Sequence, residues 1–259
     1  MNARNGETWL LDLGNSRAKL ARLAHGGPVD VTALDWTQPD FTARMRELTG
    51  RWPRPSRILV ASVVRAELAD RVRDLLPAGP GTEVEWLRTP RQACGVGNRY
   101  AKPERLGIDR FLSMVAVHAQ TVGAALVIGC GTAMTLDAVG ASGEHAAGLI
   151  ALSPGRMLEA LRVDTAIAAG NPDAFLGDGG DDTAAALQAG CWSAAGALVE
   201  WFAARHRADL GEVPVWLHGG WAARLAEWLA RDGFQAGVFE HAALHGLAVW
   251  SATSRCDRP

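Results

Sequence analysis

The feature that most constrains the fold of this chain is a pattern of three strand-like segments joined by two turns, which occurs twice. Each copy opens with an apolar segment that runs into a glycine turn, and segments of alternating polarity follow. The segments are 9–16, 17–23 and 29–34 in the first copy and 124–128, 134–139 and 147–152 in the second. The two glycine turns, at Gly14 and Gly131, lie about 117 residues apart. A duplicated meander of this kind predicts a protein of two similar halves.

Helical and strand-like segments alternate after each meander. Helical patterns cover 41–48, 66–76, 108–121, 153–169, 183–207, 221–231 and 246–251, and strand patterns cover 58–62, 84–87 and 213–217. Meanders followed by such alternation predict an α/β protein, with residues 1–119 and 120–259 as its two domains. A cleft between two similar domains is the usual place for a ligand.

The charge balance narrows the classes of partner. With 26 basic and 28 acidic residues the net charge is -2, so we expect neither nucleic acid nor a membrane as the main partner. No apolar run is long enough to span a bilayer, and the polar first residues lack the pattern of a signal peptide. The four cysteines include no C-x-x-C pair, so neither a zinc site nor a disulfide framework is expected. These features predict a cytoplasmic protein.

Glycine-bearing turns at strand ends are the candidates for phosphate binding. The chain has no G-x-x-x-x-G-K-[ST] loop and no G-x-G-x-x-G after a strand, so neither a P-loop nor a Rossmann site is expected. It does have turns at 12–16, 131–132 and 218–220. Successive backbone N–H groups in such turns bind anions, and Asp12 could hold a hydrated Mg²⁺. Each turn alone fits an ordinary hairpin, but together they favour a phosphate site.

A fourth turn, at 106–110, carries the candidate for acid–base chemistry. Asp109 stands at the start of a predicted helix beside Arg110, after a loop that holds Tyr100 and Lys102. The carboxylate could cap the helix, or it could be the base for a substrate hydroxyl. Arg110 could grip a carboxylate or a phosphate with its planar fork. The seven histidines show no triad spacing, so we expect no catalytic histidine.

In their order along the chain, six short motifs resemble the type III pantothenate kinases, a family of the acetate and sugar kinase, heat-shock chaperone and actin superfamily. The motifs are Asp12-Leu13-Gly14-Asn15-Ser16, Leu106-Gly107-Ile108-Asp109-Arg110, Gly131-Thr132-Ala133-x-Thr135-x-Asp137, Pro154-Gly155, Asp182-Thr183 and Gly219-Gly220. The resemblance implies two ribonuclease-H-like domains in an actin-like ATPase fold with an interdomain ATP cleft. It also implies a homodimer that catalyses ATP + pantothenate → ADP + 4′-phosphopantothenate, the first step of coenzyme A biosynthesis.

The resemblance assigns roles by position. Asp109 would be the catalytic base, and Asp12 would hold the Mg²⁺ that accompanies ATP, through water. The ATP-binding residues would be Asp12, Leu13, Gly14, Asn15, Ser16, Arg17, Ala18, Lys19, Gly131, Thr132, Gly219 and Gly220. The pantothenate-binding residues would be Tyr100, Gly107, Ile108, Asp109, Arg110 and Thr183.

Two positions depart from the family pattern. Ser16 stands where the family usually has threonine, which keeps the hydroxyl. Gly129 stands where many members have an aspartate that binds an activating K⁺ or NH₄⁺. Since glycine has no side-chain oxygen, we expect activation by K⁺ to be weak or absent.

Two other functions stay open from the sequence. A kinase of the same superfamily could share the ATP turns and phosphorylate another small hydroxyl substrate. A non-catalytic nucleotide-binding accessory factor for transcription is a second alternative, although the net charge of -2 disfavours direct contact with DNA. The presence of Asp12, Asp109, Arg110 and Thr132 favours a working enzyme.

Overall fold

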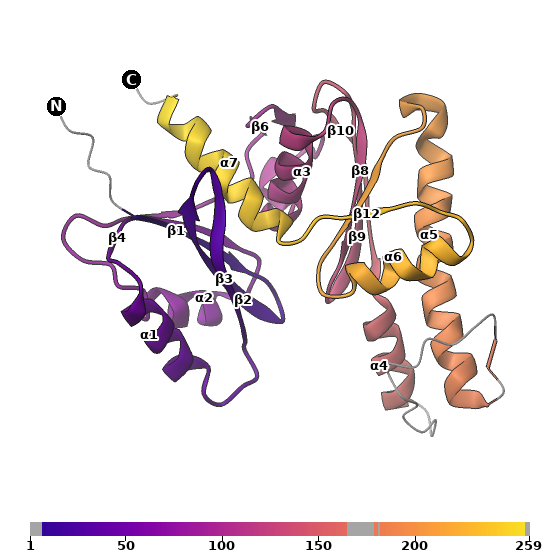
Figure 1. Ribbon diagram of the computed structural model, residues 1–259, viewed down its shortest axis with the longest axis horizontal. Helices are drawn as coiled ribbons and strands as arrows, with labels where there is room; N and C mark the ends of the chain where they lie inside the picture. The colour runs from indigo at the N-terminus through magenta and orange to yellow at the C-terminus, as the bar shows by residue number, and fades with distance from the viewer. Residues whose placement is uncertain (1–6, 165–178, 181, 257–259) are drawn as a thin grey trace. The chain divides into compact units, whose positions relative to one another are not determined.

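The computed structural model describes residues 7–164, 179–180 and 182–256, and these form two compact units. The first unit contains the described residues up to Gln120 together with those from His241 onward. The second unit contains the described residues from Thr121 to Glu240. Figure 1 shows the elements of both units with their labels.

The first unit is built on a five-stranded sheet with the order β3-β2-β1-β4-β5. β1, β2 and β3 form the predicted antiparallel meander, and β4 and β5 extend the sheet in parallel. The strands are β1 (Glu7–Leu13), β2 (Arg17–Ala24), β3 (Gly27–Asp35), β4 (Pro55–Ser62) and β5 (Glu83–Trp86).

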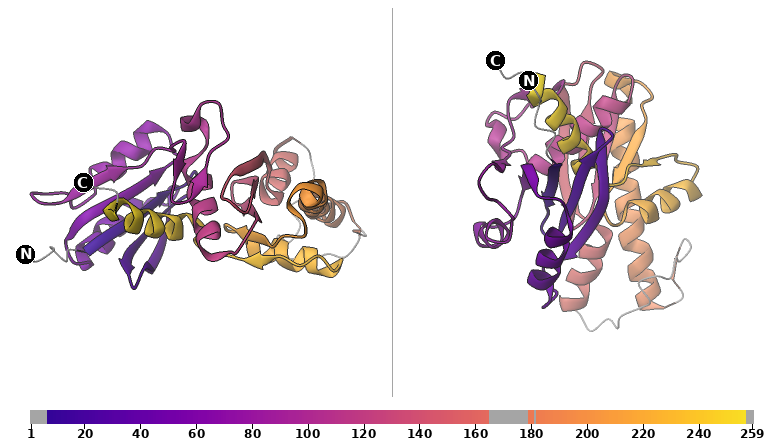
Figure 2. Two further views of the ribbon diagram at one scale, coloured as in Figure 1. Left: turned by 90° about the horizontal axis from the view of Figure 1, so that it is seen from above. Right: turned by 60° about the vertical axis from the view of Figure 1, so that its left-hand side comes forward.

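The two faces of this sheet are covered by different helices. Trp9, Leu11 and Leu13 of β1 belong to a buried cluster with side chains of α1 (Phe41–Arg51) and α2 (Ala66–Arg73). Figure 2 shows α7 (Ala242–Cys256) across the sheet from these two helices. Because successive side chains of a strand point to opposite faces, Asp12 lies on the face away from α1 and α2.

Helix α7 belongs to the first unit, whereas the sequence assigned all of 120–259 to the second domain. Leu244 and Leu247 of α7 are buried, and the helix packs against α3 (Ile108–Gln120) (Figure 1). Gly246 allows this close approach, because a Cβ at that position would overlap the carbonyl oxygen of Leu112. A helical pattern shows that a helix buries one face, but it does not show which sheet receives that face.

The chain between β5 and α3 has little regular structure, as the loop-rich sequence predicts. It contains a two-stranded sheet of β6 (Gln92–Ala93) and β7 (Val96–Gly97), which the sequence did not reveal. A single 3₁₀ turn, η1 (Pro103–Arg105), leads into α3. This connection, residues 87–107, is called the β5–α3 loop below.

The second unit repeats the topology of the first. Its sheet has the order β10-β9-β8-β11-β12, in which β8, β9 and β10 form an antiparallel meander and β11 and β12 run parallel to β8. The strands are β8 (Ala125–Cys130), β9 (Ala133–Val139), β10 (His145–Leu152), β11 (Val215–His218) and β12 (Gly237–Val238). The predicted duplication is therefore confirmed in the order and direction of the strands.

The helices of the second unit are α4 (Pro154–Asp164), α5 (Thr183–Leu210) and α6 (Ala222–Arg231). The core of this unit joins Leu136 of β9 to Trp192 of α5 and Leu225 of α6. The helix predicted over 153–169 corresponds to α4 up to residue 164, and 165–169 lie outside the described residues. No helix in the described part of the chain is long and apolar enough to cross a membrane.

Candidate functional site

Asp12 lies in β1, one residue before the end of the strand, and not in the turn where the sequence placed it. Its backbone pairs with Lys19 on β2 and with Ala61 on β4. Lys19 Nζ donates to Asp12 Oδ2 at 3.1 Å, and the Asp12 side chain is only 7% exposed. A buried carboxylate is thus held at the end of the sheet by a cation on the neighbouring strand.

The turn 14–16 follows directly and is closed by its own backbone. Gly14 N donates to the carbonyl oxygen of Arg17 at 3.1 Å. The indole of Trp36 donates from Nε1 to the carbonyl oxygen of Gly14 at 2.7 Å, which fixes the turn from outside. Asn15 and Ser16 are exposed. A fixed turn that faces solvent can present its N–H groups to an anion such as phosphate.

Asp109 lies in the first turn of α3. Its Oδ1 accepts a hydrogen bond from the backbone N–H of Arg110 at 2.8 Å. Gly107 leaves room for the carboxylate, because a Cβ at position 107 would lie 2.6 Å from Asp109 Oδ1. Burial raises the pKa of Asp109, and the negative charge of Asp12 raises it further, against smaller lowering effects of Arg110. The carboxylates of Asp12 and Asp109 are therefore close enough for their charges to interact.

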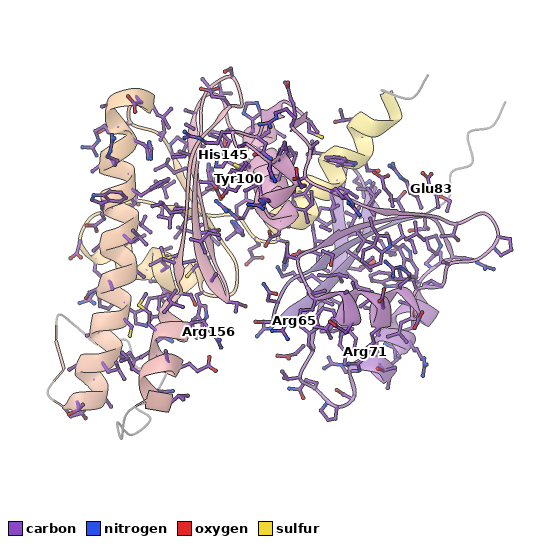
Figure 3. All side chains as sticks on the ribbon, turned by 180° about the vertical axis from the view of Figure 1, so that it is seen from behind. Arg65, Arg71, Glu83, Tyr100, His145 and Arg156 are labelled. Atoms are coloured by element: carbon purple, nitrogen blue, oxygen red, sulfur yellow. The ribbon has the colours of Figure 1, made fainter. Side chains whose placement is uncertain are left out.

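Arg110 and Tyr100 meet beside this carboxylate. Arg110 is 5% exposed, and its Nη1 donates to Tyr100 Oη at 3.1 Å. Tyr100 comes from the β5–α3 loop and is labelled in Figure 3. Ile108, which lies between Gly107 and Asp109, is buried. The first unit thus brings together four of the predicted site residues, which are Asp12, Tyr100, Asp109 and Arg110.

The turn between β8 and β9 is the counterpart of the first turn. Gly131 N donates to the carbonyl oxygen of Ala133, two residues ahead, at 3.0 Å, whereas Gly14 N donates three residues ahead to that of Arg17. Ser153 Oγ donates to the carbonyl oxygen of Thr132 at 3.1 Å. Thr132 and Ala133 are exposed. The second unit therefore holds a fixed, solvent-facing turn of the same kind.

The turn after β11 packs against the end of β8. Gly219 has φ of +98°, and a Cβ there would lie 2.6 Å from the carbonyl oxygen of Cys130. Trp221 N donates to the same carbonyl oxygen at 3.0 Å. Only glycine suits position 219, because any side chain would be both strained and in collision. The structure thus places Gly219 and Gly220 next to the strand that leads into the Gly131 turn.

Thr183 is exposed at the first position of α5 in the second unit. The residue before it, Asp182, caps the helix, because its Oδ1 accepts a hydrogen bond from Ala185 N at 2.8 Å. In the Asp-Thr motif, Asp182 therefore has a structural role as the helix cap, and Thr183 presents an exposed hydroxyl. Thr183 belongs to a different unit from Tyr100 and Asp109.

The first unit has a donor set that fits Mg²⁺ carried by ATP. Within the described ranges, no three His, Cys, Asp or Glu side chains are grouped as ligands of one metal ion. Mg²⁺ bound with a nucleotide needs only one or two protein carboxylates, since phosphate oxygens and water complete its shell. Asp12, with Asp109 near it, supplies that number.

The surroundings of Gly129 do not fit a monovalent-cation site built on a carboxylate. Gly129 pairs with Thr135 across β8 and β9. A Cβ at position 129 would lie 2.5 Å from Thr135 Oγ1 and 3.1 Å from His218 Cε1. The space that an aspartate side chain would need is therefore filled by the threonine hydroxyl and the imidazole ring.

Two buried groups, the Cys130 thiol and the Asp137 carboxylate, lie on the strands that flank the second turn. Burial raises the pKa of Cys130 to about 12, so its thiol stays protonated and is a poor nucleophile. Asp137 ends the Gly-Thr-Ala-x-Thr-x-Asp motif, and its Oδ1 lies 3.0 Å from His145 Nε2, with both side chains buried. This pair joins β9 to β10.

The sequence did not reveal the side chains that hold the candidate residues in place. Trp36 is 22 residues from Gly14, and Thr89 is 17 residues from Leu106, whose carbonyl oxygen it binds. Neither spacing matches a local motif. Asn98 is a third such residue, and its place in a loop-rich segment did not show that its side chain binds the loop backbone.

Comparison with known proteins gives a family match over most of the chain. The family of type III pantothenate kinases matches residues 9–205. A type III pantothenate kinase of Xylella fastidiosa is 36% identical over 252 residues, which cover 95% of this chain and 98% of that protein. Another, of Stenotrophomonas maltophilia, is 37% identical over 247 residues, which cover 94% of this chain and 96% of that protein.

Solved structures share the fold at low sequence identity. A Campylobacter jejuni protein described as a Baf family transcriptional activator is 15% identical with a TM-score of 0.61, over 95% of this chain and 99% of that chain. An inorganic polyphosphate/ATP-glucomannokinase from Arthrobacter is 15% identical with a TM-score of 0.50, over 96% and 100%. These likenesses confirm the predicted actin-like fold of two related α/β units. With a family match along residues 9–205 and relatives aligned over nearly the whole length, this chain belongs to the type III pantothenate kinase family.

Proposed function

We propose that this protein transfers the γ-phosphoryl group of ATP to the hydroxyl of pantothenate, giving ADP and 4′-phosphopantothenate in the first step of coenzyme A biosynthesis. Membership of the family supports this activity. The structural observation that carries it is the buried Asp109 carboxylate beside the Arg110–Tyr100 pair. That arrangement offers a base for a hydroxyl and a cation for an acidic substrate.

Asp109 is the base in this proposal. A new bond forms between the substrate oxygen and the γ-phosphorus, the bond from that phosphorus to the β–γ bridging oxygen breaks, and the hydroxyl proton passes to Asp109. Burial raises the pKa of Asp109, which strengthens the carboxylate as a proton acceptor once it is ionised. Gly107 supports the role, since its missing side chain leaves the space that Asp109 Oδ1 occupies.

Arg110 and Tyr100 bind the acceptor substrate. The guanidinium of Arg110 is buried and already oriented by Tyr100 Oη, so it would lose little freedom when it pairs with a carboxylate or a phosphoryl oxygen. Gly107 and Ile108 would line the same place by their position next to Asp109. Thr183 is proposed as a further pantothenate contact from the family pattern.

The glycine turns bind the phosphates of ATP. The Gly14 and Gly131 turns are each closed by a backbone hydrogen bond and expose the residues that follow the glycine. Asp12 would hold Mg²⁺ through water, and the ion supplies charge neutralisation at the phosphates when it is bound. Lys19 holds the Asp12 carboxylate, and Gly219 and Gly220 would contact adenosine.

We also propose that the enzyme is a cytoplasmic homodimer that works without K⁺. The cysteine usage and the absence of a signal-peptide pattern in the sequence support the location, and the family resemblance supports the dimer. The crowding of Gly129 by Thr135 and His218 supports the independence of K⁺. Light scattering of the purified protein would give twice the chain mass of 27.5 kDa for a dimer, and the chain mass itself would contradict it.

The test of the function is ADP release from Mg-ATP with and without pantothenate, beside a panel of small sugars and hydroxy acids. We expect ADP release that depends on pantothenate and on no other acceptor of the panel. Release with another acceptor would show a kinase of different specificity. Nucleotide binding without any acceptor-dependent release would show a binding protein, and both outcomes would overturn the proposal.

A further inference from the structure

The β5–α3 loop carries Tyr100 but has almost no regular structure of its own. Its conformation therefore depends on side chains that bind its backbone. Asn98 is the central one, and it is only 4% exposed. Its Nδ2 donates to the carbonyl oxygens of Pro90 at 3.2 Å and Pro103 at 3.0 Å, and its Oδ1 accepts from Tyr100 N at 2.9 Å. Both amide donors and the amide acceptor are thus used inside the loop.

Arg91 binds the backbone of residues 98–101, the segment that contains Tyr100. Its Nη1 donates to the carbonyl oxygens of Asn98 at 2.9 Å and Tyr100 at 2.7 Å, and its Nη2 donates to that of Ala101 at 3.1 Å. In return, Asn98 N donates to the carbonyl oxygen of Arg91 at 2.8 Å. Three hydrogen bonds from one planar guanidinium fix the path of the chain at Tyr100.

The ends of the loop are joined beside α3. Thr89 Oγ1 donates to the carbonyl oxygen of Leu106 at 2.7 Å, and both residues are buried. Leu106 directly precedes the turn that carries Asp109 and Arg110. The hydrogen bonds of Asn98, Arg91 and Thr89 therefore fix the backbone on both sides of the contact between Tyr100 Oη and Arg110 Nη1.

We infer that Asn98 is a positioning residue of the acceptor site, which sets the Tyr100 hydroxyl against the Arg110 guanidinium before the substrate arrives. The inference rests on the proposed function, in which that pair binds pantothenate. A preorganised pair loses less freedom on binding than a pair on a free loop, so the benefit is in substrate affinity. In the proposed function ATP binds at the glycine turns and not at this loop, so we expect its binding not to depend on Asn98.

The kinetic test compares Asn98→Ala with Gln92→Ala, which removes an exposed polar side chain from the same loop. We expect Asn98→Ala to raise KM for pantothenate by about tenfold, the effect of one or two lost hydrogen bonds, and to leave KM for ATP unchanged. Gln92→Ala should change neither. An unchanged KM for pantothenate, or an equal rise in both constants, would overturn the inference.

Arg91→Ala and Arg91→Lys keep the test valid if Asn98→Ala does not fold. The Arg91 side chain is exposed, so its removal leaves the core intact. Arg91→Ala should raise KM for pantothenate alone, and Arg91→Lys should restore part of the loss through its remaining donor. Normal KM values in both variants would contradict the claim that hydrogen bonds within the β5–α3 loop position Tyr100.

Tyr100 also allows a test that does not use activity, because it is the only tyrosine in the chain. Protein labelled with 3-fluorotyrosine should give one dispersed ¹⁹F resonance. We expect Asn98→Ala to move this resonance toward the position of free 3-fluorotyrosine, and Gln92→Ala to leave it in place. An unmoved resonance in Asn98→Ala would refute the positioning role. A resonance that moves in Asn98→Ala, together with no turnover of pantothenate by the wild type, would show that Asn98 positions Tyr100 but that the proposed function is wrong.

Discussion

At the scale of the single residue, the burial of Asp109 has two opposite effects on its carboxylate: it makes ionisation costly, and it makes the ionised form a stronger proton acceptor. Its carboxylate is buried and close to a second carboxylate on Asp12, so the ionised form is costly. The same cost makes the ionised form a better proton acceptor than an exposed aspartate. Phosphoryl transfer through a loose transition state does not require a raised pKa of the base, but burial raises that of Asp109 all the same.

The stability of the protein should depend on pH through Asp109 with a definite sign. In the unfolded chain the carboxyl titrates near its ordinary value of about 3.9, and in the folded chain its pKa is higher. Between those values the folded state binds more protons, so the stability of the wild type relative to Asp109→Asn falls as pH rises. Thermal melting of both proteins between about pH 4 and pH 8 measures this difference. A difference that is constant or that grows with pH would contradict the burial of the carboxylate.

Gly129 leads to a prediction about monovalent cations. Replacing Na⁺ by K⁺ should leave the rate of the wild type unchanged within error, because Thr135 and His218 fill the space beside this glycine. Gly129→Asp should lower the melting temperature without creating a response to K⁺. Melting curves and rates in the two buffers check both parts. A several-fold activation by K⁺ in the wild type would show that other oxygens supply the ligands.

At the scale of the element, the turns are fixed by backbone geometry that tolerates little change. Gly219→Ala places a Cβ against the Cys130 carbonyl oxygen at a positive φ, and Gly220→Ala is the matched control because a Cβ there meets nothing within 4 Å. A left-handed residue costs about 1–2 kcal/mol before the collision is counted. We expect Gly219→Ala to lower the melting temperature by at least about 4 °C and to weaken ATP binding. Gly220→Ala should retain the melting temperature, and an equal fall in the two variants would contradict the packing of this turn on β8.

The sequence predicted the elements whose signals are local. The two meanders follow from alternating polarity and from the glycine turns at Gly14 and Gly131, and both stand in the structure with the same strand order. The hairpin of β6 and β7 was missed, because strands of two residues are too short to show alternation. The position of Asp12 in β1 and not in the turn depends on pairing with β2 and β4, which no single segment reveals.

The residues of the candidate site that lie within one motif were predictable from the sequence, and those that come from distant positions were not. Asp109 and Arg110 stand next to each other in one motif, and the structure places them together with Tyr100. The supports of these residues come from distant positions, as Trp36 and Thr89 show, and each forms a hydrogen bond that only the folded chain brings about. Chemistry-bearing residues were therefore visible in the sequence, and the residues that orient them were not.

At the scale of the whole molecule, the chain returns to its first unit at the end. Helix α7 packs on α3 through Gly246, so the first unit is complete only when the last helix is in place. Gly246→Ala should destabilise the protein by forcing α7 away from the Leu112 carbonyl group. Gly190→Ala, in the interior of α5 with nothing within 4 Å of its Cβ, should raise stability by up to about 1 kcal/mol. Urea unfolding of the two variants measures the contrast, and a neutral Gly246→Ala would contradict the close packing of the helices.

In the proposed reaction this protein phosphorylates pantothenate with Asp109 as the base. The most direct measurement is ³¹P NMR of a reaction that contains Mg-ATP and pantothenate, with the wild type and with Asp109→Asn. With the wild type we expect the resonance of a phosphate monoester and the two resonances of ADP, with the monoester and ADP formed in equal amounts. We expect a rate lower by about 10²–10⁴-fold with a variant that folds normally. Absence of the monoester with the wild type, or equal rates for the two proteins, would contradict the proposed reaction.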